Sequence, residues 1–232
     1  MTKYEIVAND LINRINNNEF KETLKIPTED QLVDEYNVSK NTIRNAIKIL
    51  VKSGLVYSVQ GSGMFIKESR KYNTVFINGT RGITKDHPGQ KIVTKCLSLE
   101  IINADAQLAE TMQCDIGTSI YYIVRLRIVD DVPYALEHTY YNKDIIPYLN
   151  REIAESSIYK FLKDDLHMSF GFADKYISSR KLEKDESELL GLESGDPCII
   201  IEDNVYLSNG TLFNSSNIIY NYKLAHFFMT VE

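Results

Sequence analysis

Polar side chains suited to reading DNA gather on one face of a helix predicted near the start of the chain. Ile43, Ala46 and Leu50 recur at helical spacing and define its buried face, and Ser53-Gly54 ends it. Arginine and asparagine can bond bidentately to base edges, lysine neutralises phosphate, and a helix N-terminus offers N–H groups to phosphate. The residues placed to contact DNA are Ser39, Lys40, Asn41, Thr42, Arg44, Asn45 and Lys48.

Two more helices and a hairpin are predicted around this helix. Apolar spacing predicts one helix over residues 4–15, and Thr28 with Gln31 has capping-box spacing at the start of another. The β-prone runs 55–59 and 64–67 are joined by a glycine-rich segment typical of a hairpin tip. Three helices and a hairpin indicate a winged helix-turn-helix, whose wing tip carries Gln60, Gly61 and Ser62.

Charge is distributed unevenly along the 232 residues. Residues 1–70 contain 10 basic and 9 acidic side chains, whereas the remainder contains 16 and 23, so the first part carries +1 and the second −7 of the net charge of −6. A locally basic segment on an acidic protein favours a small polyanion-binding surface, although charge alone leaves a solvated basic helix open.

Composition excludes several other classes of protein. With 44% hydrophobic and 25% charged residues the chain is expected to fold, and its apolar runs are too short for the ~20 residues of a membrane span. No signal peptide is predicted, and three scattered cysteines favour neither disulfides nor zinc. We therefore expect a cytoplasmic protein without a metal, a cofactor or a membrane partner.

An internal repeat organises the second part of the chain. A nine-residue motif that starts at Ala109 recurs 78 residues later from Ser187, and each copy precedes a strand, a turn and another strand. Two such units predict an antiparallel sheet flanked by helices, although chance recurrence stays open. Residues 67–90 are rich in glycine and mixed charge and are interpreted as the connection, with a short strand at 72–77.

Two arginines in this part could bind an anion. Arg125 and Arg127 alternate with apolar residues and so share one face of a strand, opposite Glu137 and Tyr141 on the next strand. Paired arginines form a fork for phosphate or carboxylate, and a carboxylate accepts bonds from sugar hydroxyls. The alternative is an exposed strand face on which an arginine pairs with Glu137.

Catalytic signatures are absent from the sequence. It contains no glycine-rich phosphate loop, no GxSxG elbow and no HExxH motif, and its four histidines lack metal-ligand spacing. His138 is expected in a core or surface role, and Cys96, Cys114 and Cys198 as buried apolar residues. We expect no enzyme activity.

The first seventy residues carry a family pattern: Ile26-Pro27-Thr28-Glu29, then Val38-Ser39-Lys40-Asn41-Thr42-Ile43-Arg44, then Gln60-Gly61-Ser62-Gly63-Met64-Phe65. It resembles the DNA-binding domain of the GntR family of bacterial repressors. The resemblance implies DNA contacts by Lys40, Thr42 and Arg44, with Gly61 at the wing. Lys40 stands where arginine is usual, so we expect a phosphate contact there. Glu29 is expected to act on its helix dipole rather than on DNA.

The second part has a pattern of its own: Thr94-Lys95-Cys96-Leu97, Arg125-Leu126-Arg127, Pro133-x-Ala135-Leu136-Glu137 and Ser157-x-Tyr159. It resembles the UTRA effector domain of the HutC subfamily, whose fold is similar to chorismate lyase. The resemblance implies that Thr94, Arg125, Arg127 and Ser157, with the loop at Lys95, bind phosphate. It also implies that Glu137, Tyr159 and Tyr220 bind a sugar. Asn214 departs from the glutamate of several relatives.

These observations predict an α+β protein with a DNA-binding domain at 1–68, a linker at 69–90 and an effector and dimerisation domain at 91–232. We expect a homodimeric repressor that binds a pseudo-palindromic operator in double-stranded DNA. A small molecule, most readily a phosphorylated sugar, is expected to release it. The alternatives are a carboxylate-sensing regulator of the same family and a chorismate-lyase-like enzyme.

Overall fold

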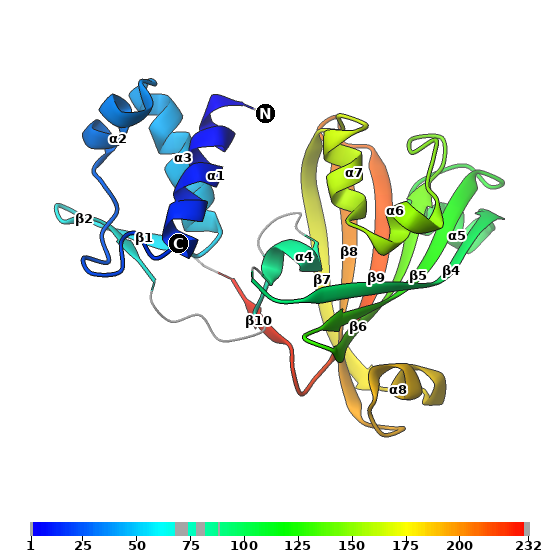
Figure 1. Cartoon of the computed structure of the whole chain (residues 1–232). Helices are drawn as coiled ribbons and strands as arrows, with labels where there is room; N and C mark the ends of the chain where they lie inside the picture. Colours follow the sequence, from blue (N-terminus) through cyan, green and yellow to red (C-terminus); the bar gives the residue numbers. More distant parts are fainter. Residues whose placement is uncertain (1, 68–73, 78–81, 88, 230–232) are drawn as a thin grey trace. The chain divides into compact units, whose positions relative to one another are not determined.

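The structure, a computed structural model, describes residues 2–67, 74–77, 82–87 and 89–229 (Figure 1). These residues divide into two compact units. The first contains residues 2–67 with 76–77 and 227–229, and the second contains 74–75, 82–87 and 89–226.

The first unit is a winged helix-turn-helix, as predicted. Its elements are α1 (Lys3–Asn16), α2 (Glu29–Tyr36), α3 (Lys40–Lys52), β1 (Val56–Val59) and β2 (Gly63–Ile66). Thr28 caps α2 in a reciprocal box with Gln31, and the Ser39 hydroxyl accepts the Thr42 N–H to cap α3. These local bonds stop and start the helices where the sequence indicates. Leu11, Leu32, Ile43 and Leu50 are fully buried and form the core that joins the three helices.

The wing is held to the helical core by backbone pairing. β1 and β2 are antiparallel, with Val59 opposite Gly63, and Gly61 at the tip has a φ of 75°, which favours glycine. The segment before α2 attaches to β2, because Ile26 N–H donates to Met64 and Ile66 N–H donates to Leu24. The tip therefore projects from a fixed base.

The second unit is built on one six-stranded antiparallel sheet. The repeated helix–strand–turn–strand units are confirmed: α5 (Ala106–Met112) and α8 (Lys184–Leu190) each precede a hairpin, and the two hairpins meet where Ala135 pairs with Tyr220. The strand order is β4 (Ile92–Asn103), β5 (Ser119–Val129), β6 (Val132–Asn142), β9 (Leu212–Asn221), β8 (Pro197–Leu207) and β7 (Phe170–Lys181).

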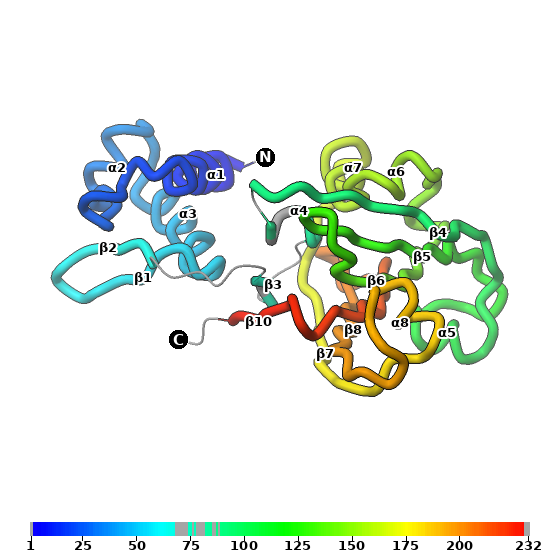
Figure 2. Tube along the Cα trace, turned by 60° about the horizontal axis from the view of Figure 1, so that its bottom comes forward, coloured from blue at the N-terminus to red at the C-terminus, as the bar shows by residue number. Residues whose placement is uncertain are grey.

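Helices cover both faces of this sheet. Figure 2 shows α6 (Arg151–Glu155) and α7 (Ile158–Asp164) on one side and α5 and α8 on the other. The first pair packs on Tyr121, Ile123 and Phe213, and the second side contains the buried clusters of Leu126 and Met112. We call the side under α6 and α7 the inner face, because the candidate effector residues lie there.

The segment interpreted as a connection holds regular structure. β3 (Thr74–Phe76) lies within the predicted short strand and pairs with β10 (His226–Phe228). The four-residue α4 (Ile83–Asp86) was not predicted, because one helical turn is too short to show a hydrophobic period. No helix in the described ranges combines the length and apolar character needed to cross a membrane.

Candidate functional site

The outer face of α3 presents the predicted DNA-reading side chains. Ile43, Ala46, Ile47 and Leu50 point into the core, which turns the polar side chains outward. Ser39, Lys40, Asn41, Arg44 and Lys48 are exposed, and Thr42 and Asn45 are half-buried. The tip residues Gln60, Gly61 and Ser62 are also exposed.

Two of these cations are paired with the first turn of α2. Arg44 Nε lies 3.0 Å from Glu29 Oε2, and Lys40 Nζ lies 2.7 Å from Asp30 Oδ1. Glu29 begins α2, as expected for a residue acting on the dipole, but it also orients Arg44. Exposed ion pairs contribute only about 0–1 kcal/mol, so a DNA phosphate or base edge can replace these carboxylates at little cost.

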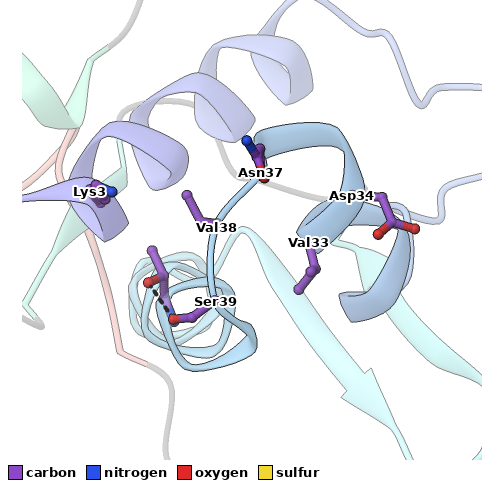
Figure 3. Close-up of a pocket in the computed structure, with 7 residues that line it drawn as sticks. Lys3, Val33, Asp34, Asn37, Val38 and Ser39 are labelled. Atoms are coloured by element: carbon purple, nitrogen blue, oxygen red, sulfur yellow. Dashed lines mark hydrogen bonds between the residues drawn. The ribbon is translucent and has the colours of Figure 1, made fainter.

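A hollow of about 440 Å³ lies where α1 and α3 begin and α2 ends (Figure 3). Lys3, Asp34 and Ser39 are among its lining residues. In its wall the Ser39 and Thr42 hydroxyls lie 2.9 Å apart, and Ser39 Oγ also accepts the Thr42 N–H as the cap of α3. Its lining residues include one lysine and one aspartate, so the charges of the wall balance.

The inner face of the sheet brings the two arginines and Glu137 together. Arg125 is the register partner of Glu137, and Arg127 lies one pleat along the same strand. Glu137 carboxylate oxygens lie 2.6 Å from Arg125 Nη2 and 3.5 Å from Arg127 Nη1. The three residues are only 7%, 3% and 4% exposed. The pairing that we considered as the alternative is therefore present, but on a buried face rather than an exposed one.

The arginine pair keeps unused donors. Arg125 Nη1 donates to the Ala154 carbonyl of α6 at 3.3 Å, and Arg127 Nη2 donates to Thr84 Oγ1 of α4 at 3.0 Å. The buried Nε atoms of both arginines have no hydrogen-bond partner in the described part of the chain. Two cations that share one carboxylate leave a net charge of +1 in a low-dielectric site, which favours binding of an anion.

The shifts in pKa follow from this crowding. Burial lowers the pKa of Arg127, and repulsion from Arg125 adds to the effect, while the attraction of Glu137 opposes both. Burial also works against the charge of Arg125, but the attraction of Glu137, together with smaller contributions from Tyr141 and Tyr159, outweighs burial and raises the pKa. An anion beside Arg127 would stabilise the charge that burial disfavours.

Hydrogen-bonding side chains continue along the inner face beside the arginines. Tyr159 of α7 donates to Asn214 Oδ1 at 3.0 Å, and Asn214 Nδ2 lies 3.2 Å from both the Tyr140 carbonyl and Ser216 Oγ. Burial raises the pKa of Tyr159, so its hydroxyl is neutral. Asn214 is fully buried, so its amide orientation is set by the protein. The side chains of Tyr159, Asn214 and Ser216 can therefore donate hydrogen bonds to hydroxyl groups and accept hydrogen bonds from them.

The register places most of the predicted effector residues on this face. Thr94 pairs with Arg127, and Tyr220 pairs with Ala135, which is itself opposite Arg127. Ser157 caps α7 by accepting the Lys160 N–H at 3.3 Å. Lys95 differs: it is exposed and opposite Leu126, so its side chain lies on the other face. Residues that we missed are Thr84, Thr139, Lys175, Asp203 and Ser216.

Family comparisons agree with both units. The family model "Bacterial regulatory proteins, gntR family" matches residues 3–66, and the UTRA domain model matches residues 87–224. This chain belongs to the GntR family. The pairing of these two domains places it among the HutC-type regulators, as the sequence indicated.

Individual relatives of this GntR-family chain extend the comparison. The HTH-type transcriptional regulator GmuR of Bacillus subtilis (strain 168) is 33% identical over 93% of this chain and 92% of its own. The repressor MngR of Escherichia coli (strain K12), of the mannosyl-D-glycerate transport/metabolism system, is 27% identical over 94% and 91%. The crystal structure of the possible transcriptional regulator YydK from Bacillus subtilis aligns with this chain over the full length of both, with a TM-score of 0.80 and 28% sequence identity.

The three cysteines and His138 of this GntR-family regulator occupy buried or half-buried positions. Cys96 and Cys198 are buried, as predicted, whereas Cys114 is half-buried. His138 bonds to the Tyr122 hydroxyl at 2.8 Å. In the described ranges no group of three histidine, cysteine or acidic residues could hold a metal ion.

Because two of its histidines are largely buried, the protein should lose folding stability in mild acid. Burial lowers the pKa of His87 and of His138 below the ordinary value of 6.5. As pH falls below 6.5 the unfolded chain takes up these protons before the folded chain does, so each group reduces stability by at most about 1.4 kcal/mol per pH unit. We expect the unfolding temperature to fall between pH 7 and 5.5. The fall should be smaller in His87→Gln/His138→Gln, and an equal fall in both proteins would contradict the assignment.

Proposed function

We propose that this GntR-family regulator is a homodimeric, cytoplasmic repressor whose operator affinity is lowered by a phosphorylated sugar. The supporting observation is the buried pair Arg125 and Arg127, which shares Glu137 and leaves both Nε donors unpartnered in the described residues. An anion that accepts these N–H groups neutralises the site and satisfies donors that are otherwise costly to bury.

The neighbouring groups favour a polyol attached to that anion. Glu137, Asn214 and Ser216 supply buried acceptors, and Tyr159 supplies a neutral hydroxyl. The anion alone does not separate phosphate from carboxylate, because arginine binds both. A row of hydroxyl partners suits a sugar, and the relative MngR is named as the repressor of a mannosyl-D-glycerate system.

On the DNA side, each protomer would place α3 in the major groove with the wing tip beside the backbone. Two protomers joined through the second unit would read half-sites about 34 Å apart. The effector must bind the operator-competent dimer less tightly than the released form, because equal affinity for both shifts nothing.

Equilibrium operator binding tests this proposal. A duplex selected from a random library by the full-length protein is titrated by fluorescence anisotropy, alone and with each effector. The effectors are glucose and mannose 6-phosphates, the unphosphorylated sugars, glycerate and urocanate. Release by a sugar phosphate but not by its parent sugar supports the proposal, whereas release only by a carboxylate refutes it. Consumption of chorismate without DNA would favour the enzyme alternative.

A further inference from the structure

A second buried polar cluster lies on the inner face of the sheet, away from the arginines. Lys175 of β7 and Asp203 of β8 are register partners, and Lys175 Nζ lies 2.6 Å from Asp203 Oδ2. Asp203 is 4% exposed, and its other oxygen, Oδ1, has no hydrogen-bond partner in the described residues. The pair therefore offers one free acceptor beside an ammonium group that has further protons to donate.

The strand register connects this pair to the candidate effector site. Asp203 is opposite Ser216 on β9, which is opposite Thr139 on β6. Thr139 lies one pleat along β6 from Glu137 on the same face. Thr139 and Ser216 are both buried. A buried polar track thus crosses the sheet from Arg125 to Lys175.

The track is longer than one phosphorylated sugar ring requires. Strands lie about 4.8 Å apart, so the three steps from Arg125 on β5 to Asp203 on β8 span about 14 Å. An effector that touches both ends must extend beyond a single ring. Tyr159 and Asn214 lie at the middle of this path.

Packing gives no reason for the pair. Its neighbours along β8 on the same face are Ile201 and Val205, and apolar residues at both positions would avoid the desolvation of two ions. The carboxylate oxygen that accepts no hydrogen bond in the described residues adds a further desolvation cost. Burial raises the pKa of Asp203 in spite of Lys175 beside it, as expected for a buried carboxylate with one oxygen that no hydrogen-bond donor reaches in the described residues.

We propose that Asp203 and Lys175 form a second polyol subsite, so that the effector is a phosphorylated disaccharide or a glycoside of similar length. This inference rests on the proposed function. One hydroxyl of the distal unit donates to Asp203 Oδ1, and a neighbouring hydroxyl accepts from Lys175 Nζ. The phosphate of the proximal unit lies on Arg125 and Arg127.

Calorimetric titration of the full-length protein tests the subsite. The probes are glucose 6-phosphate and three larger compounds that contain it: trehalose 6-phosphate, maltose 6′-phosphate and cellobiose 6′-phosphate. We expect at least one of the larger compounds to bind about tenfold or more tightly than glucose 6-phosphate, the equivalent of one or two satisfied buried hydrogen bonds.

The double variant Asp203→Asn/Lys175→Gln keeps the shape and neutrality of the pair and should remove that gain. The affinity of this variant for glucose 6-phosphate should stay within about twofold of the wild-type value. If the pair had only a structural role, the affinity for every phosphorylated probe would fall together. Asp174→Asn/Lys184→Gln makes the same chemical changes at exposed positions and should alter neither affinity. Far-UV circular dichroism and unfolding temperature check that both variants fold.

Two results would overturn the inference. If the double variant loses affinity equally for the monosaccharide and disaccharide phosphates, or if no disaccharide phosphate binds more tightly, the subsite is refuted while the phosphate assignment stands. If no phosphorylated probe binds to the wild-type protein, the proposed function fails and the subsite fails with it.

Discussion

Substituting Arg125→Met together with Glu137→Gln should abolish release from the operator by the effector and leave operator affinity unchanged. Charge-assisted hydrogen bonds of the kind that Arg125 can make contribute about 1.5–3 kcal/mol each. Losing them should raise the effector concentration for half-release about a hundredfold or more. The measurement is operator anisotropy against effector concentration.

The double change is needed because Arg125 is buried against its partner. Removing the arginine alone leaves the Glu137 carboxylate with only Arg127, 3.5 Å away, and breaking a buried pair costs about 3–5 kcal/mol. A single variant could therefore fail by unfolding, whereas the double variant loses one charge of each sign.

A matched control exists on the opposite face of the same sheet. Arg180 and Glu186 form a two-oxygen ion pair beneath α8, and Arg180 is opposite Cys198 in the outer-face cluster. Arg180→Met/Glu186→Gln should leave half-release unchanged. Normal release by the Arg125 variant, or equal loss in both variants, would refute the anion assignment.

Arg44→Ala should remove specific operator binding and leave effector binding intact. A bidentate arginine–guanine contact discriminates between bases by about 1–3 kcal/mol, or about fivefold to 150-fold per half-site, and a dimer loses it at both. Operator affinity should fall toward that for unrelated DNA, while the effector dissociation constant from calorimetry does not change.

Two control variants separate base reading from general charge. Lys21→Ala removes an exposed cation outside α3 and should change operator affinity by less than about twofold. Glu29→Gln removes the carboxylate that holds Arg44 at 3.0 Å without removing the guanidinium, so most affinity should remain. If both Arg44→Ala and Lys21→Ala lower the affinity for the selected duplex and for unrelated DNA by the same factor, Arg44 does not read bases.

Local chemistry made the first unit predictable. Thr28 with Gln31 and Ser39 with Thr42 form caps within four residues of sequence, and the wing is closed by adjacent strands. Each of these features depends on neighbours in the chain, so spacing alone was sufficient. The exposed ion pair between Arg44 and Glu29 was not predicted, since it depends on the angle between two helices.

Long-range register limited the prediction of the effector face. The alternation of Arg125 and Arg127 fixed their common face, but Asn214 and Asp203 reach it only because β6 pairs with β9 and β9 with β8. No local pattern specifies those pairings. Burial also depended on tertiary structure, because α6 and α7 cover a strand face that the sequence alone allowed to be exposed.

The two hairpins of the sheet carry different parts of the proposed effector site, one for the anion and one for the sugar. Arg125, Arg127 and Glu137 come from the first hairpin, whereas Asn214, Ser216 and Asp203 come from the second. Under the proposed assignment, substitutions in the later hairpin would change which sugar is preferred and would leave the anion contacts of the first hairpin in place. Specificity could thus change in one half of the sheet without altering the other half.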